Sequence, residues 1–95
     1  NEPSSYYAPG SVCRNSLVAD GCIIEGTVEN SIIFHNARVG KGAVIRDSIL
    51  FQNTVIGTDA QLRYVITDKD VTIGAGAVLN GAAHHPFVLA KGSTV

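Results

Sequence analysis

The stretch NSIIFHNARVGKGAVIR, residues 30–46, decides the fold because the chain repeats it twice more without a gap. DSILFQNTVIGTDAQLR follows at residues 47–63 and YVITDKDVTIGAGAVLN at residues 64–80, so each unit is 17 residues long. NSLVADGCIIEGTVE, residues 15–29, is the same unit shortened by two residues. Self-similarity at a fixed period is typical of solenoids, in which successive units stack on one another.

The two ends of the chain continue the repeat as partial units. SYYAPGSVCR, residues 5–14, matches residues 37–46, and FVLAKGSTV, residues 87–95, matches residues 71–79. The sequence GAAHHP separates the last whole unit from the C-terminal partial unit. The sequence therefore predicts three regions: a leading segment with a partial coil at 1–14, four coils at 15–80, and a loop with a terminal partial coil at 81–95.

A shorter motif recurs within each unit: a small or β-branched residue, one variable residue and then an aliphatic residue. In residues 30–46 the paired positions are Ser31 and Ile33, Ala37 and Val39, and Ala43 and Ile45. Alternation with a period of two indicates a short strand with one buried face. A helix is excluded because the apolar spacing is two and six rather than three and four. Three strands in each unit, separated by turns, predict an all-β solenoid of triangular coils with parallel strands.

The composition excludes several classes of protein. Hydrophobic residues make up 45% of the chain, so intrinsic disorder is excluded. The formal net charge of −1 and the lack of a basic run argue against nucleic-acid binding. No apolar stretch approaches the ~18–20 residues of a membrane span, and no signal peptide is visible. Cys13 and Cys22 both occupy inward positions of the repeat, so we expect two buried thiols, no disulfide and a cytoplasmic location.

The repeated hexads, which read small-x-aliphatic-Gly, resemble those of the hexapeptide-repeat proteins. Gly40, Gly57 and Gly74 follow the second aliphatic position of successive units, where we expect them to give the backbone freedom to turn. SLVADGCIIEG at 16–26 is similar to the start of the C-terminal domain of bacterial glucose-1-phosphate adenylyltransferase (ADP-glucose pyrophosphorylase). PFVLAKGSTV at 86–95 is similar to the GlgD-type subunit of that enzyme. The resemblance implies a left-handed parallel β-helix, a hand that the general preference for right-handed parallel crossovers would not predict.

The same resemblance implies the chemistry of a parent protein. That protein would join ATP and glucose 1-phosphate to form ADP-glucose and pyrophosphate for glycogen biosynthesis. The reaction belongs to an N-terminal nucleotidyltransferase domain that uses ATP and Mg²⁺, and this domain is absent from the 95 residues. The chain has no methionine and begins at Asn1, so we expect it to be a piece of that longer polypeptide. We therefore expect no catalytic, cofactor-binding or metal-binding residue here, and a role in assembly or regulation within a homo- or hetero-oligomer of pyrophosphorylase subunits.

A second interpretation is a hexapeptide acyltransferase domain that binds acyl-CoA. Enzymes of that kind use a loop histidine as general base, and His35 would be the residue. However, its position in the repeat is occupied by Asp20, Gln52 and Lys69 in the other units, which is typical of a solvent-facing corner. A carbonic-anhydrase-like scaffold is a weaker third interpretation, because it needs metal-binding histidines on several neighbouring coils.

Two other motifs are interpreted as structural. The runs Gly40-Lys41-Gly42 and Gly74-Ala75-Gly76 recur at one corner of the coil and lack the strand, helix and fuller glycine pattern of a phosphate loop. His84 and His85 lie in the segment that interrupts the repeat, and no third ligand is obvious in the sequence, so we do not expect a metal site.

The outward residues differ sharply among the three strand positions of a unit. The first position is aliphatic in every whole unit, with a phenylalanine at the next corner in two of them: Leu17, Ile32, Ile49 and Ile66, followed by Phe34 and Phe51. Such a ladder in water would be a large exposed apolar stripe. Covering it would contribute ~1.5–3 kcal/mol per side chain before the costs of binding. We predict that this face docks against the N-terminal domain or a neighbouring subunit; the alternative is that isoleucine is simply a good strand residue.

Overall fold

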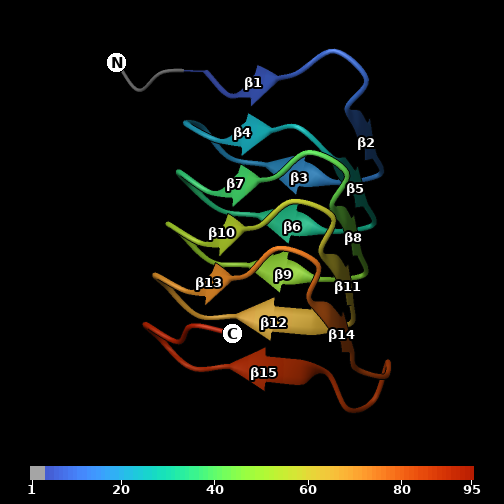
Figure 1. Cartoon of the computed structure of the whole chain (residues 1–95), viewed down its shortest axis with the longest axis vertical. Coiled ribbons are helices and arrows are strands. Elements are labelled where there is room, and N and C mark those ends of the chain that lie inside the picture. The colour runs from blue at the N-terminus through green and yellow to red at the C-terminus, as the bar shows by residue number, and fades with distance from the viewer. Residues whose placement is uncertain (1–3) are drawn as a thin grey trace.

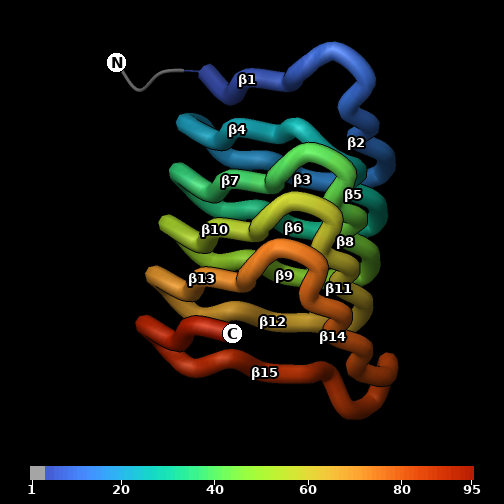
Figure 2. Tube along the Cα trace, in the orientation of Figure 1, coloured from blue at the N-terminus to red at the C-terminus, as the bar shows by residue number. Residues whose placement is uncertain are grey.

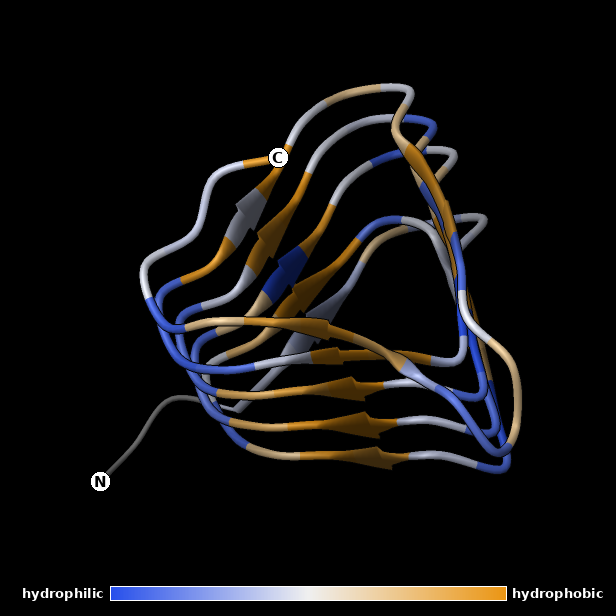
Figure 3. Ribbon diagram, turned by 90° about the horizontal axis from the view of Figure 1, so that it is seen from below, coloured by the Kyte–Doolittle hydropathy of each residue, from blue (hydrophilic) through white to orange (hydrophobic). Residues whose placement is uncertain are grey.

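Three parallel sheets wind into one solenoid in the structure, a computed structural model that describes residues 4–95 (Figure 1). Every regular element in these residues is a strand. Successive strands pass from one sheet to the next, so three strands make one coil, and each sheet collects one strand from every coil. The view along the solenoid axis shows the triangular cross-section (Figure 3). The predicted all-β solenoid of triangular coils is confirmed.

The strands are short, two or three residues each. Sheet A contains β1 (Tyr6–Tyr7), β4 (Ile23–Ile24), β7 (Arg38–Val39), β10 (Val55–Ile56) and β13 (Thr72–Ile73). Sheet B contains β2 (Val12–Arg14), β5 (Thr27–Glu29), β8 (Val44–Arg46), β11 (Gln61–Arg63) and β14 (Val78–Asn80). Sheet C contains β3 (Leu17–Val18), β6 (Ile32–Ile33), β9 (Ile49–Leu50), β12 (Val65–Thr67) and β15 (Phe87–Leu89).

The coils wind in the left-handed sense. In Figure 1 the chain runs to the right along sheet A at the front, turns to the back through sheet B and returns to the left along sheet C, descending one coil at a time. The Cα trace follows the same path and shows the protruding loop that precedes β15 (Figure 2). The hand that the resemblance implied is therefore the hand of the structure.

Strand pairing follows the repeat length. Ile49 pairs with Ile32 on one side and with Ile66 on the other, so paired residues of the equal units are 17 positions apart. Leu17 pairs with Ile32, only 15 positions away, because the first whole coil is shorter. Its missing residues lie at the corner between β4 and β5, where Glu25 and Gly26 alone replace the four-residue turn between β7 and β8.

The inward side chains form one continuous core between the three sheets. Fully buried aliphatic residues come from every sheet, among them Ile24, Ile45 and Leu50. The polar residues of the core make hydrogen bonds from coil to coil: Ser48 Oγ accepts from the Val65 amide at 3.1 Å and donates to a backbone carbonyl at 2.7 Å. Among the described residues, no buried side-chain nitrogen or oxygen lacks a hydrogen-bond partner. Stacking therefore satisfies both the apolar and the polar groups that a single coil would leave exposed.

The first residue of the corner between sheets A and B (Gly40, Gly57 and Gly74) is glycine because of close packing, and not because of backbone conformation as we expected. Gly57 has no positive φ, yet a Cβ there would lie 2.5 Å from the amide nitrogen of Ala75 in the next coil. Left-handed backbone occurs at other positions of all three corners. Between sheets B and C, Asn30, Asp47 and Tyr64 have φ of 50°, 51° and 54°. Further positions include Gly42, Asp59 and Gly76 between sheets A and B, and Asn36, Asn53 and Asp70 between sheets C and A. Asparagine and aspartate tolerate this conformation better than other non-glycine residues.

The expectation of two buried thiols is wrong for one cysteine. Cys22 is 1% exposed, and its thiol donates to the backbone oxygen of Phe34 at 3.1 Å. Cys13 pairs in register with buried Val28 but is itself exposed. Its strand, β2, lies at the edge of sheet B, so no described coil covers it. Both cysteines are free, and partial burial raises the pKa of the Cys13 thiol.

The C-terminal partial unit lies one strand earlier in the coil than its sequence match predicted. Residues 87–95 were matched to 71–79, which begins with β13 of sheet A. Instead, β15 joins sheet C, where Val88 pairs with Ile66. The chain then continues to sheet A, where Thr94 forms a bridge with Thr72. Apolar alternation is the same at all three strand positions of a coil, so it cannot show which sheet a strand joins. Because a loop interrupts the repeat before β15, the sequence did not show that this strand pairs with β12 of sheet C.

Candidate functional site

The outer face of sheet C is the most uniform surface of the solenoid. One aliphatic side chain projects from each of its five strands, and strand pairing sets these side chains in a single column: Leu17, Ile32, Ile49, Ile66 and Val88. We call these five residues the sheet C ladder. The sequence predicted the first four rungs, and Val88 was missed because the register of β15 was misassigned.

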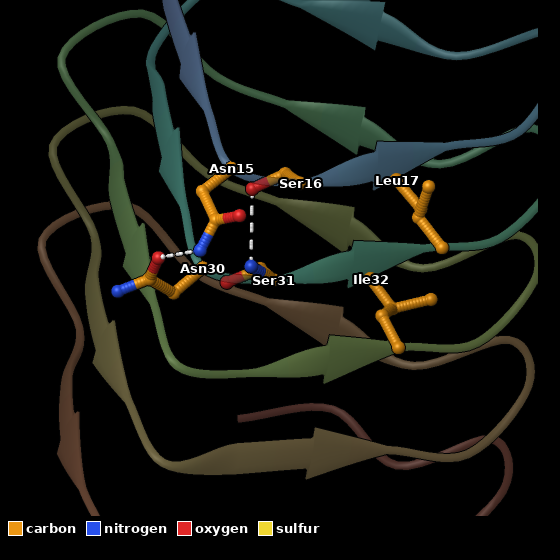
Figure 4. A pocket seen from close by; sticks show the side chains of 6 residues that line it. All are labelled: Asn15, Ser16, Leu17, Asn30, Ser31 and Ile32. Carbon is orange, nitrogen blue, oxygen red and sulfur yellow. Dashed lines mark hydrogen bonds between the residues drawn. The ribbon is translucent and has the colours of Figure 1, made fainter.

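Exposure of the sheet C ladder is greatest at its ends. Leu17 is 71% exposed and Val88 is 64% exposed, whereas Ile32 is 38% exposed and the two remaining rungs are half-buried. Figure 4 shows Leu17 and Ile32 side by side on neighbouring strands, both pointing away from the core. Beside them Asn15 donates to the side-chain oxygen of Asn30 at 2.6 Å, which marks the polar border of the ladder.

Neither of the other two sheets has a comparable outer column. In sheet A the outward residues include exposed Arg38 and Thr72, and in sheet B they include exposed Gln61. Figure 3 shows the contrast: the strands of sheet C, in the lower row, are coloured as apolar, whereas a hydrophilic strand interrupts sheet A at the upper left. Strand propensity alone would not favour one sheet, because all three are built from parallel strands of two or three residues.

Two aromatic rings extend the apolar surface at the corner where sheet C ends. Phe34 and Phe51 come from successive coils, with ring centroids 4.9 Å apart and planes tilted by 43°. Phe34 is 38% exposed and Phe51 is half-buried. An aromatic pair at this distance is stabilised beyond its area of contact. Thus the structure places all six residues of the predicted docking face on one connected surface.

Charged residues border this surface on the side of sheet B. Arg46 Nε lies 2.9 Å from Glu29 Oε1, and Arg14 Nη1 lies 3.4 Å from Glu29 Oε2. The hydrogen bond from Arg46 is the main cause that lowers the pKa of the Glu29 carboxyl, and the charges of both arginines lower it further. Arg63 forms a similar pair with Asp47 at 3.6 Å. Positive and negative charges alternate here, so most of the positive charge at this border is balanced by ion pairs.

The opposite border of sheet C carries the residues that share the position of His35. Successive coils stack there through the backbone: Asn53 donates to the His35 carbonyl at 3.0 Å, and the next two coils repeat the bond. His35 is exposed, in agreement with its predicted corner position. The residues of this column, which we call the corner column, are Asp20, His35, Gln52, Lys69 and Lys91. The charge of these residues changes from negative at the first coil to positive at the last.

The loop between β14 and β15 projects from the solenoid with both of its histidines exposed. Ala82 and His85 pair through two backbone hydrogen bonds, of 3.0 and 2.9 Å, which close the loop into a tight turn. Across residues 4–95 no three His, Cys, Asp or Glu side chains gather closely enough to hold a metal ion. In the same residues no helix is long and apolar enough to cross a membrane.

Comparison with known proteins extends over nearly all of the chain. The family of GlmU-like C-terminal hexapeptide domains matches residues 7–85. The glycogen biosynthesis protein GlgD of Geobacillus stearothermophilus is 59% identical over 93 residues, which are 98% of this chain and 27% of that relative. Glucose-1-phosphate adenylyltransferase of the same organism is 48% identical over 46 residues, 48% of this chain and 12% of that relative. GlgD of Bacillus subtilis (strain 168) is 48% identical over 46 residues, 48% of this chain and 13% of that relative.

These matches confirm the resemblance read from the sequence. The matched part of the chain spans only 12–27% of the length of these curated relatives. The relatives are thus larger proteins, in which a segment like this one is a minor part.

Proposed function

The chain belongs to the GlmU-like C-terminal hexapeptide family, and on that premise we propose that it is the assembly or regulatory domain of a glucose-1-phosphate adenylyltransferase subunit of the GlgD type. The subunit would act in glycogen biosynthesis in the cytoplasm. Catalysis with ATP and Mg²⁺ would take place in a nucleotidyltransferase domain outside these residues. The high identity to GlgD along the whole chain supports the choice of subunit.

The observation that carries the proposal is the sheet C ladder with its two phenylalanines. It is a continuous apolar surface on a domain whose other outer faces are mixed, and large exposed apolar patches mark interaction sites. We therefore assign the solenoid a docking role within a larger assembly.

The activity side of the proposal is tested with the complete polypeptide that carries the chain. We would measure ADP-glucose formation from ATP and glucose 1-phosphate by this polypeptide alone and when it is co-expressed with its catalytic homologue. We expect activity, or a change in the activity of the homologue. Binding of acetyl-CoA with neither of these effects would overturn the proposal and favour the acyltransferase interpretation, with His35 as the residue to replace next.

The docking side is tested by replacing two rungs of the ladder with lysine. The Ile32→Lys/Ile49→Lys double variant puts two charges on the surface, while the coils stay folded because both side chains point outward. We expect the mass of the assembly to fall in analytical ultracentrifugation with an unchanged circular dichroism spectrum. A Val55→Lys variant on sheet A serves as control, since Val55 is an exposed outward residue at 37%. An assembly of unchanged mass in the double variant would contradict the docking role.

A further inference from the structure

We propose that the shortened corner at Glu25 and Gly26 binds one peptide group of a basic partner segment, held between the turns of the two neighbouring coils. We call this place the corner slot. It lies where sheet A meets sheet B, opposite sheet C in the triangular cross-section (Figure 3). The corner slot is therefore separate from the sheet C ladder, and the inference does not depend on what the ladder contacts.

The corner slot exists because one turn in the stack lacks its outer half. The turns that follow β1, β7, β10 and β13 have four residues each, whereas Glu25 and Gly26 alone follow β4. In Figure 2 the turn after β1 stands apart from the regular stack of turns after β7, β10 and β13. At ~4.8 Å per coil, the two turns that flank the gap lie about 9.6 Å apart, which leaves room for one layer of polypeptide.

A hollow of about 700 Å³ opens at this gap. Pro9 and Gly10, in the turn after β1, line one wall. Lys41 and Gly42, in the turn after β7, line the other wall, and Gly26 lies between the two. Both walls are exposed to solvent, so an incoming segment reaches them without any rearrangement of the coils.

The two walls carry the backbone groups that a full turn would have paired. In the regular coils, the amide of the third turn residue donates to the carbonyl of the second turn residue one coil earlier. These bonds run from Asp59 to Lys41 at 3.0 Å and from Gly76 to Thr58 at 2.8 Å. The corner slot interrupts the series. Within residues 4–95, the Gly42 amide has no hydrogen-bond acceptor and the Pro9 carbonyl has no donor.

A single trans peptide group satisfies both of these backbone groups. A full turn would have offered the carbonyl of its second residue to Gly42 and the amide of its third residue to Pro9, and these two groups belong to one peptide bond. A trans peptide is planar and directs its C=O and N–H to opposite sides, as the two walls require. The donor and acceptor on one edge of a nucleobase point to the same side, so such an edge does not bridge the walls.

The side chains around the corner slot favour a basic partner segment. Glu25 and Asp59 contribute two carboxylates and Lys41 one ammonium, which leaves an excess of one negative charge. Asp59 Oδ1 occupies the space that a Cβ of Gly42 would take, beside the amide that has no acceptor. Tyr6, which is 56% exposed, adds a ring on which the stem of a lysine or arginine can pack. The fitting partner is thus a turn or extended segment with a lysine or arginine next to the bound peptide group.

Binding is tested with a peptide probe on the complete polypeptide that carries the chain. The probe is acetyl-GKGA-amide, the sequence of the regular turn at 40–43, which has a lysine before its central peptide group. We expect saturable binding at millimolar concentration in saturation-transfer difference NMR. In the matched control probe, N-methylglycine replaces the third residue and removes the amide that donates to Pro9. Its affinity should be about 2- to 12-fold lower, and equal affinities would overturn the proposal.

A chain that fills its own slot is the second control. Residues 25–26 are replaced by the sequence GKGA, so that a four-residue turn joins β4 to β5. The new turn supplies the acceptor for Gly42, whose amide should then exchange hydrogen as slowly as the paired amides of Asp59 and Gly76. Probe binding should be lost, and undiminished binding would contradict the proposal. If this variant does not fold, the N-methylglycine probe still decides.

Hydrogen exchange in the unaltered polypeptide identifies the source of the bound segment. If Gly42 exchanges faster than Asp59 and Gly76 until the probe is added, the corner slot takes a segment of a separate protein. If Gly42 is already as slow as they are and the probe does not bind, a segment of the same polypeptide occupies the corner slot. Fast exchange at Gly42 that millimolar probe does not slow would overturn the inference.

Discussion

Gly26→Ala is the substitution for which the structure predicts the largest loss of stability from the smallest change. Gly26 is buried at the shortened corner, where the chain lies directly against the next coil. A Cβ at this position would lie 2.7 Å from the oxygen of Gly40 and 3.0 Å from the nitrogen of Ala43, and closer still to the oxygen of Ala43. Since ordinary contacts lie at 3.4–4 Å, the backbone of the next coil has to move.

That movement also disturbs the hydrogen bonds of the corner. The Ala43 oxygen accepts from the Thr27 amide at 2.8 Å, and the Gly40 oxygen accepts from the Ala43 amide at 3.1 Å. Overpacking of a close-packed interior costs about 1–3 kcal/mol, and we expect the upper end of that range because backbone atoms must shift. A loss of about 3 kcal/mol lowers the melting temperature by roughly 12–24 °C for a domain of this size.

Gly76→Ala is the matched control for Gly26→Ala. Gly76 has a φ of 72°, and a Cβ there would meet no atom within 4 Å. Its substitution therefore costs only the left-handed backbone penalty of about 1–2 kcal/mol. Both variants would be unfolded with urea and followed by far-UV circular dichroism. A Gly26→Ala variant no less stable than Gly76→Ala would refute the steric reasoning.

Three further predictions concern polar groups and thiols. Ser48→Ala leaves a buried amide without its acceptor and should cost about 1–3 kcal/mol in urea unfolding, more than Ser16→Ala at the half-exposed first coil; equal losses would contradict this. The pKa of Glu29 is lowered in the folded chain, so its stabilising effect is present above the unfolded pKa and is lost on acidification. Glu29→Gln should therefore approach wild-type stability as the pH falls, and a constant difference in a pH series of urea titrations would exclude this. Exposed Cys13 should react with a thiol reagent in the native chain and buried Cys22 only after unfolding, so two native reactive thiols would disprove the assignment.

Much of the fold follows from the sequence because a solenoid is built from local rules that repeat. Alternation within Ala43 to Ile45 fixes which side chains point inward, and the 17-residue period fixes which residues become neighbours on adjacent coils. The same two rules were enough to predict that Ile32, Ile49 and Ile66 share one outer column. The hand of the coil did not follow from them and came from the family resemblance.

Only the tertiary structure decided the features that depend on which residues of neighbouring coils a residue contacts. Cys13 follows the inward pattern but is exposed because no described coil covers it. Val88 joins the ladder because β15 pairs with β12 of sheet C, and this pairing does not follow from the alternation within β15. Gly57 is needed because the backbone of the next coil lies against it. A local pattern sets the direction of a side chain, whereas burial, register and close contact arise only when the coils are stacked.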